Sequence, residues 1–381
     1  MKRTQCACYH ALHSMNPAGV YIHIPFCSSR CSYCDFATGI YQIELAERYV
    51  RALIDEIRSS QLSAARVDTI YFGGGTPSLL EPQQLARILA AVHERFEIDP
   101  QAEITLEINP GSATPAKLLA FRELGINRAS FGAQTFDDRE LAKLGRSHTA
   151  ADARRTFHDL RAAGFANISF DLIAGLPGQT LAGWERNVDE ALALRPEHLS
   201  FYLLEVHSGT PLAQHIERGI QPVPDEDLAA VMYESMLERA VAAGYEHYEI
   251  SNLCLPGFQS RHNTKYWTGE PYFGFGCSAH SYDGISRRWS NERQVTEYVR
   301  LVEEGLKPLV EEHELTIQDL RSEALFLGLR LMRGVSVDLC KDYGPDLERF
   351  REAGLLELDG DYVRLTRNGA LLSNEVFSAF V

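Results

Sequence analysis

Three closely spaced cysteines are the residues of this chain with the most distinctive chemistry. Cys27, Cys31 and Cys34 follow the spacing C-x3-C-x2-C, directly after an apolar run at residues 20–24 that predicts a strand. Pro25 restricts the residue before it and lacks a backbone donor, so we expect the thiols on a loop beyond the strand. On a loop, side chains three and four residues apart can converge on one centre.

Thiolates at this spacing favour an iron–sulfur cluster, which is usually held by four such ligands. Three on one loop, with no obvious fourth, predict a [4Fe–4S] cluster on Cys27, Cys31 and Cys34 whose last iron is open to a small molecule. The alternatives are a structural zinc site and three unrelated buried thiols. Zinc normally takes four closed protein ligands, often as paired C-x2-C units.

Composition narrows the class of protein. The chain has 381 residues, of which 45% are apolar, enough for one large domain and a smaller one. The net charge is −15 and no Lys/Arg run could follow a phosphate backbone, which argues against nucleic-acid binding. Eight cysteines, five of them outside the loop, form no secreted framework and indicate a reducing cytoplasm. No apolar run reaches the roughly 18 residues of a membrane span.

The first fourteen residues predict no folded element. Residues 1–14 contain Cys6 and Cys8 but lack the apolar centre of a signal peptide. We expect a disordered leader here, and Met15 is an alternative translation start.

Six apolar runs at regular intervals predict the strands of one sheet. Each is followed by a helical pattern or a long connection, and this alternation specifies a parallel sheet covered by helices. A doubly wound open sheet and a six-unit partial barrel give the same one-dimensional pattern. In both, ligands bind at the carboxyl ends of the strands. The expected strands are residues 20–24, 67–72, 104–108, 126–131, 168–173 and 199–204.

Glycines and polar residues gather at these strand ends. The turn Gly73–Pro77 lacks the P-loop and dinucleotide-binding patterns, and its backbone, free of Cβ atoms, can approach a ligand closely. Glu107 ends an apolar strand, where an unpaired carboxylate is costly to bury, so we expect it to meet a polar or cationic ligand. The ordinary alternatives are a tight strand–helix turn for the glycines and a salt bridge for Glu107.

The combined pattern resembles a known family. C-x3-C-x2-C with an aromatic residue before the last cysteine is the signature of radical SAM proteins. The string from Tyr21 to Cys27, with Cys34-Asp35-Phe36, resembles the branch of oxygen-independent coproporphyrinogen III dehydrogenases and HemW-type haem chaperones. The resemblance implies an α/β fold, a radical SAM partial (β/α)6 barrel with a smaller α+β C-terminal domain. It also implies that the open iron binds S-adenosylmethionine, which reduction cleaves to a 5′-deoxyadenosyl radical.

Several residues match cofactor-binding positions of this family. By resemblance, the glycine turn meets the methionyl amino group, Glu107 contacts S-adenosylmethionine, and other matches hold a second molecule of it in the dehydrogenases. Arg146 would pair with a carboxylate, and Asp171 with a hydroxyl or ammonium group. Two tyrosines match cofactor contacts, although either could belong to the core. The implied set is Tyr21, Tyr33, Gly74, Gly75, Thr76, Glu107, Gln134, Arg146 and Asp171.

The segment H-N-x-x-Y-W, which starts at His262, distinguishes the two kinds of protein in this branch, the haem chaperones and the dehydrogenases. Its histidine could coordinate a haem iron, and its aromatic residues Tyr266 and Trp267 could stack against the ring. Composition alone favours a hydrogen-bonded surface histidine. The segment resembles the haem-binding motif of the HemW-type chaperones, which the dehydrogenases lack. Phe36 also stands where the dehydrogenases carry a fourth cysteine.

We interpret the chain as a HemW-type haem chaperone that binds a [4Fe–4S] cluster, S-adenosylmethionine and, through His262, haem. We expect a leader at residues 1–14, the radical SAM partial barrel at 15–245, and a C-terminal domain at 246–381 that includes the haem segment. The acceptors would be haemoproteins such as respiratory enzymes. The expected location is the cytoplasm, with peripheral association at the inner face of the membrane and a homodimer left open.

Two rival interpretations stay open. The first is an oxygen-independent coproporphyrinogen III dehydrogenase, which would convert two propionate side chains to vinyl groups and give protoporphyrinogen IX. The second is a zinc-stabilised binding protein. The sequence leaves open whether the chain acts as an enzyme, and whether S-adenosylmethionine is cleaved in its working cycle.

Overall fold

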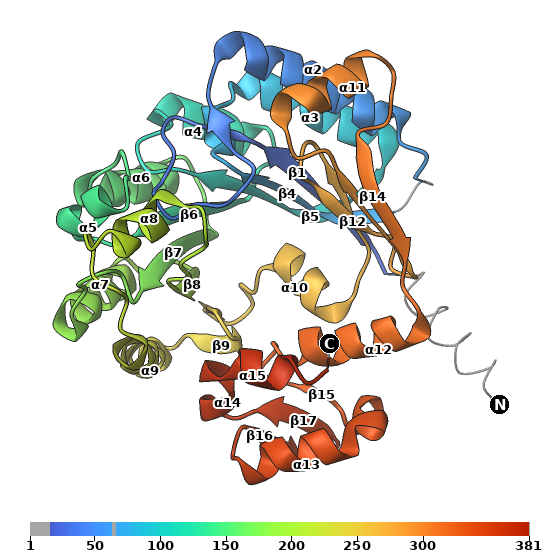
Figure 1. Cartoon of the computed structure of the whole chain (residues 1–381). Coiled ribbons are helices and arrows are strands. Elements are labelled where there is room, and N and C mark those ends of the chain that lie inside the picture. The colour runs from blue at the N-terminus through green and yellow to red at the C-terminus, as the bar shows by residue number, and fades with distance from the viewer. Residues whose placement is uncertain (1–15, 63–65, 381) are drawn as a thin grey trace.

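The computed structural model describes residues 16–62 and 66–380, so the leader expected at residues 1–14 lies outside the described part. Its largest feature is a 12-stranded sheet with the strand order β14-β13-β12-β11-β1-β4-β5-β6-β7-β8-β10-β9. Figure 1 shows that the sheet curves, with helices along its outer face and the C-terminal part of the chain across its open side.

Six neighbouring strands run parallel in chain order, which confirms the six repeated units that the sequence predicted. Most of their residues are buried, because helices cover the outer face and the curve encloses the inner one. This double burial explains why the runs are apolar without a clear alternation. The strands are β1 (Ala18–Ile24), β4 (Arg66–Gly74), β5 (Glu97–Ile108), β6 (Arg128–Gln134), β7 (Ile168–Ala174) and β8 (His198–Leu203).

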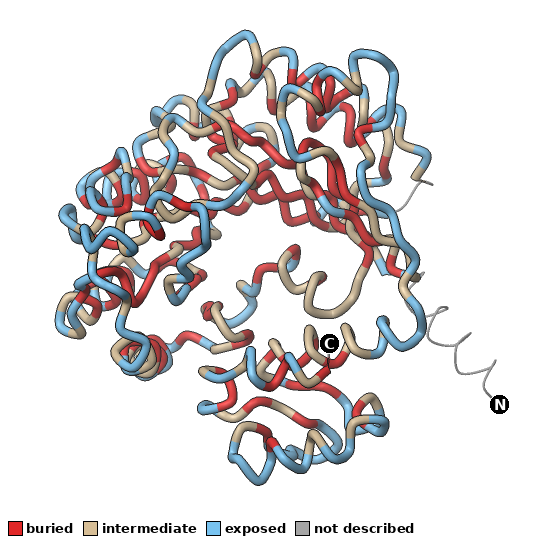
Figure 2. Tube along the Cα trace, viewed as in Figure 1, coloured by how far each residue is buried: buried red, intermediate tan, exposed pale blue. Residues whose placement is uncertain are grey.

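The helices between these strands start at local capping signals. The hydroxyl oxygens of Thr114, Thr149 and Thr180 each accept a hydrogen bond from a first-turn amide of the helix that follows. Figure 2 shows the helices buried toward the sheet and exposed on their outer sides. They are α2 (Ile43–Ser59), α3 (Pro82–Arg95), α4 (Pro115–Glu123), α5 (Asp138–Lys143), α6 (Ala150–Ala162) and α7 (Leu181–Leu194).

The sheet extends beyond the six parallel strands on both sides. β11 pairs in parallel with β1, and the remaining added strands pair antiparallel. The division expected at residue 245 stays a prediction, and the sheet continues through that position. The added strands are β9 (Glu246–Glu249), β10 (Asn252–Cys254), β11 (Tyr272–Phe275), β12 (His280–Tyr282), β13 (Arg287–Asn291) and β14 (Leu309–Glu314).

Two further parts complete the molecule. The short helix α10 (Arg261–Thr268) lies on the concave side of the curved sheet (Figure 1). Residues 317–380 have a separate hydrophobic core and a three-stranded antiparallel sheet. Their elements are α12 (Ile317–Gly328), β15 (Val335–Ser336), α13 (Gly344–Glu352), β16 (Leu356–Asp359), β17 (Tyr362–Leu365), α14 (Arg367–Leu371) and α15 (Ser373–Phe377).

Two outer helices follow the parallel strands, α8 (Pro211–Glu217) and α9 (Glu226–Ala242), and α11 (Val295–Glu303) packs beside α2. In the described part of the chain, no helix has both the length and the apolar character that crossing a bilayer requires.

Candidate cluster and cofactor site

The three cysteines lie on a closed loop beyond the carboxyl end of β1. The short parallel strands β2 (Phe26–Cys27) and β3 (Gly39–Ile40) join the two ends of the loop, with Gly39 N donating to Pro25 O at 2.7 Å. Ser32 N donates to Leu144 O at 2.9 Å, which ties the loop to the chain after α5. The loop is therefore held at both its base and its far side.

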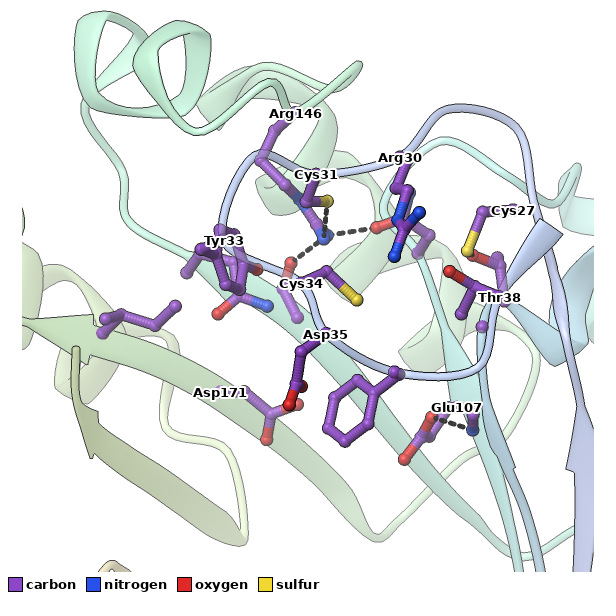
Figure 3. A pocket seen from close by; sticks show the side chains of 18 of the residues that line it. Cys27, Arg30, Cys31, Tyr33, Cys34, Asp35, Thr38, Glu107, Arg146 and Asp171 are labelled. Atoms are coloured by element: carbon purple, nitrogen blue, oxygen red, sulfur yellow. Dashed lines mark hydrogen bonds between the residues drawn. The ribbon is translucent and has the colours of Figure 1, made fainter. Parts of the chain in front are cut away.

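The loop covers a cavity of about 440 Å³ at the carboxyl ends of the parallel strands. Figure 3 shows Glu107 and Asp171 on the strands, with the cysteines on the loop in front of them. The cavity confirms that strand ends far apart in the sequence meet at one place. The predicted residues that line it are Cys27, Cys31, Tyr33, Cys34, Gly74, Gly75, Thr76, Glu107, Gln134, Arg146 and Asp171.

The thiol groups fit the role of ligands to a multi-iron cluster. All three are unpaired and partly exposed, and they face the same cavity. Burial raises the pKa of the Cys27 and Cys34 thiols, an effect that bound iron would oppose because it stabilises the thiolate. In the described residues no three His, Cys, Asp or Glu side chains form a site for a single metal ion.

The glycine turn after β4 is tight because it packs against the base of the cysteine loop. Gly74 has φ +114°, and a Cβ atom there would lie 2.5 Å from the His23 ring. A Cβ on Gly75 would lie 2.7 Å from Phe26 O, and Gly75 N donates to Ile24 O at 2.8 Å. Packing alone thus demands glycine here, and the same turn also presents its backbone to the cavity.

Two buried carboxylates, Glu107 and Asp171, face the cavity, and neither forms a salt bridge in the described chain, although the charge of Arg128 acts on both. Glu107 accepts hydrogen bonds from Tyr71 OH at 2.8 Å and from Gly74 N at 3.1 Å, and burial raises its pKa to about 7. Burial also raises the pKa of Asp171, which a hydrogen bond from Ser200 partly offsets. A ligand with an ammonium or sulfonium charge would stabilise both ionised forms.

Arg146 connects the strand ends to the cluster loop. Its Nη1 lies 3.4 Å from Cys31 Sγ, its Nη2 donates to Gly132 O at 2.9 Å and to Asn109 Oδ1, and its Nε has no partner in the described chain. Beside it, Gln134 has φ +63°, a left-handed conformation that costs energy for a non-glycine residue. The register also shifts between Gly132 and Gln134. This irregular strand end directs polar groups into the cavity.

Two residues of the predicted set do not line the cavity. Tyr21 lies behind the glycine turn, where its hydroxyl is 3.0 Å from His23 Nδ1. His262 is 1% exposed and packs inside the curved sheet. Its Nδ1 lies 2.8 Å from Thr69 Oγ1 and its Nε2 lies 2.9 Å from Tyr266 OH. Burial lowers the pKa of His262 to about 3, so the ring is neutral.

Sequence reasoning missed other residues that line or approach the cavity. Asn109 follows the predicted strand end directly and could have been found by that position. Tyr202 lies near the end of β8, and His207 follows β8 on an irregular segment that carries no recognisable motif. Arg128 is buried inside the sheet, and its Nε and Nη1 have no partner in the described chain.

Comparisons with known proteins agree with this geometry. The radical SAM superfamily model matches residues 21–191, which contain the cysteine loop and most of the parallel strands. The model of the HemN C-terminal domain matches residues 315–372, nearly the whole of the smaller core.

Individual relatives cover almost the full chain. The chain is 39% identical over 373 residues to the protein named heme chaperone HemW of Bacillus subtilis, which is 95% of this chain and 98% of the relative. It is 37% identical over 343 residues to the radical S-adenosyl methionine domain-containing protein 1, mitochondrial, of Mus musculus, which is 87% of this chain and 77% of the relative.

One solved structure shares the whole fold. The structure of coproporphyrinogen III oxidase HemN from Escherichia coli has a TM-score of 0.84 to this chain and covers 99% of it and 93% of its own length, at 22% identity. That identity shows the fold alone.

The chain therefore belongs to the radical SAM superfamily and, within it, to the HemW family. Membership of the superfamily implies a [4Fe–4S] cluster and S-adenosylmethionine, and the donors around the cavity fit both. The individual residues that hold them stay predictions.

Proposed function

We propose that this chain is a haem chaperone, which binds haem and transfers it to acceptor haemoproteins. The observation that carries the proposal is the 39% identity to the Bacillus subtilis protein named heme chaperone HemW over nearly the whole of both chains. The similarity to the coproporphyrinogen III oxidase at 22% identity does not favour the enzyme, because it extends to the fold only.

The cavity residues would hold the cofactors in this proposal. Cys27, Cys31 and Cys34 would each bind one iron of the cluster, which, when bound, supplies an open iron site and an electron. Glu107 and the backbone of the glycine turn would meet the methionyl end of S-adenosylmethionine. Arg146, which already lies against Cys31 Sγ, would bind a carboxylate and keep it beside the loop.

The remaining predicted cofactor contacts are of two kinds. Tyr33, Thr76, Gln134 and Asp171 line the cavity and would contact S-adenosylmethionine, in one or two molecules. Tyr21 would act indirectly, by packing against the glycine turn. Its ring lies so close to Gly73 that a Cβ atom there would contact it. The superfamily implies that S-adenosylmethionine binds, and these proposals assign its contacts to particular residues.

His262 remains the residue predicted to bind the haem iron. In this conformation both ring nitrogens are engaged and the ring is buried, so binding through His262 requires the ring to become accessible and one nitrogen to lose its hydrogen bond, with Thr69 or with Tyr266. The neutral state of the ring suits coordination.

The proposal includes a cytoplasmic chain that meets its acceptors, respiratory enzymes among them, at the inner face of the membrane, as a monomer or a homodimer. Sedimentation of the full chain with and without vesicles and with and without haem would measure both properties.

A haem-transfer assay tests the function. The full chain is reconstituted without oxygen, loaded with haem, separated from free haem and mixed with an apo-haemoprotein. We expect stable haem absorbance that moves to the acceptor. Coproporphyrinogen III is offered in a parallel reaction with reductant and S-adenosylmethionine. Formation of protoporphyrinogen IX, or failure to take up haem, would contradict the proposal.

A further inference from the structure

We propose that Arg128 binds a propionate carboxylate of haem while His262 holds the iron. This inference rests on the proposed haem-chaperone function and adds a second contact to it. Haem carries two carboxylates at one edge of its ring, and a guanidinium group binds a carboxylate through two parallel hydrogen bonds. Arg128 lies inside the curved sheet, in the same interior as His262, and outside the lining of the cysteine cavity.

Arg128 is a buried cation that the fold leaves without a bonded partner. The residue is 1% exposed at the start of β6, and its Nε and Nη1 have no hydrogen-bond partner in the described chain. Among the described residues no carboxylate forms a salt bridge with it. Burying a charged group without hydrogen bonds costs free energy, so a ligand that completes its bonding would gain directly.

A second unpartnered group lies beside Arg128. Thr105 is paired with Arg128 in the register of β5 and β6, and it is 0% exposed. Its Oγ1 has no hydrogen-bond partner in the described chain. Residues paired across neighbouring strands present their side chains on the same face of the sheet. A guanidinium and a hydroxyl, both able to donate to a carboxylate, therefore lie next to each other.

This pair lies next to the point where the sheet anchors α10. Glu103 is two residues before Thr105, about 7 Å along the strand and on the same face. Glu103 Oε1 accepts a hydrogen bond from His262 N at 3.1 Å. Burial lowers the pKa of His262, and the charges of Lys265 and Arg128 lower it further. The predicted iron ligand and the unpartnered guanidinium thus occupy neighbouring positions in one interior.

The carboxyl groups of the protein itself do not neutralise Arg128. Its charge acts on Glu107 and Asp171, but burial outweighs that charge and raises the pKa of both. The pKa of Glu107 reaches about 7, so this carboxyl is only partly ionised at neutral pH. A haem propionate would supply the negative charge that the interior lacks.

The experiment compares ferric haem with its dimethyl ester, in which both carboxylates are uncharged. The full chain, reconstituted without oxygen, is titrated with each and followed by absorbance. We expect Arg128→Met to weaken haem binding by about tenfold or more and to leave binding of the ester unchanged. The Soret band should keep its position, because the iron ligand is not altered. Arg186→Met, on the exposed side of α7, is the matched control and should bind both like the unaltered chain.

Thermal unfolding without haem separates this role from a structural one. Arg128→Met removes a buried charge that has no bonded partner, so the variant should unfold at the same temperature as the unaltered chain or at a higher one. A lower unfolding temperature would show that Arg128 stabilises the fold, and would contradict the inference.

The affinities decide the remaining alternatives. Equal losses for haem and the ester, or unchanged haem affinity, in Arg128→Met would overturn the inference. A parallel loss of S-adenosylmethionine binding would assign the guanidinium to the carboxylate of that molecule instead. If Arg128→Met does not fold, Arg128→Lys and Thr105→Val should each reduce the preference for haem over the ester, and an unchanged preference in both would overturn the inference. Absence of haem binding by the unaltered chain would refute the proposed function itself.

Discussion

The mouth of the barrel and the segment around His262 both carry residues that the sequence marks as ligands, yet the fold treats them differently. At the mouth, thiols, carboxylates and a glycine turn face a cavity, and two buried polar atoms there, Thr38 Oγ1 and Arg146 Nε, lack a protein partner in the described chain. Around His262, both ring nitrogens have partners, and the ring stacks on Tyr71 with centroids 5.1 Å apart.

The difference distinguishes polar side chains that are free to bind a ligand from polar side chains whose hydrogen bonds are already made within the protein. A buried polar group that has its hydrogen bonds stabilises the fold, and a ligand must replace those bonds before it gains anything. A polar group that faces a cavity without a partner gains from a ligand directly. On this criterion the mouth is prepared for its cofactors, and His262 is not prepared for haem in this conformation.

The largest expected effect is at the cysteines. Cys31→Ser and Cys34→Ser should abolish cluster assembly, because an alcohol is a far weaker ligand for iron than a thiolate. Iron and acid-labile sulfide analysis after anaerobic reconstitution measures this. Cys340→Ser is the matched control, since Cys340 lies buried in the smaller core. A full complement of iron in the loop variants would contradict the assignment of the mouth.

A smaller effect is expected from the glycine turn. Gly74→Ala places a Cβ against the His23 ring at positive φ and should cost about 1–3 kcal/mol in strain. The turn would move, and S-adenosylmethionine should bind at least several-fold more weakly in calorimetric titration. Gly39→Ala is the control, because a Cβ there meets open space. Equal affinity of the two variants for S-adenosylmethionine would show that the glycine turn is not part of the cofactor site.

The pH dependence of stability should have opposite signs in the two regions. The pKa of His262 is lowered from 6.5 to about 3, so the unfolded chain binds this proton more readily, and stability is lost as the pH falls from 6.5 toward 3. The pKa of Glu107 is raised from 4.5 to about 7, so its contribution is lost as the pH rises from 4.5 toward 7. Thermal unfolding across this range measures both effects, with His262→Gln and Glu107→Gln removing one slope each. Unchanged slopes in the two variants would contradict the burial of these groups.

The smallest effect is expected from Thr69→Val. It removes the hydroxyl that is bonded to His262 Nδ1 and should destabilise the chain by about 1 kcal/mol. If His262 leaves Thr69 to coordinate the haem iron, haem should bind at least as tightly to this variant as to the unaltered chain. Weaker haem binding would contradict that role of His262.

Local signals explain the part of the fold that the sequence predicted. The helical pattern that follows the expected strand 168–173 matches α7, because Thr180 caps the start of the helix and its buried residues recur three or four positions apart. The strands β11 to β14 were missed, because they are short and contain glycine or charged residues, and only pairing through β1 places them in the sheet.

In the site, too, local sequence signals predicted some residues, and long-range contacts determine the positions of others. The cysteines, the glycine turn and Glu107 could be predicted because each lies at or just beyond the carboxyl end of a recognisable strand. The position of His207 could not, since it depends on how the segment after β8 folds against the cysteine loop. The burial of His262 could not be predicted either. Its partner Thr69 is 193 residues away in the sequence.

The central claim is that the mouth holds a [4Fe–4S] cluster with one iron open to S-adenosylmethionine. Electron paramagnetic resonance of the reduced, anaerobically reconstituted chain, recorded with and without S-adenosylmethionine, tests it most directly. We predict the signal of a reduced [4Fe–4S] cluster whose g values shift when S-adenosylmethionine binds the open iron. A signal that is identical with and without S-adenosylmethionine, or protein that takes up zinc and no iron, would contradict the account.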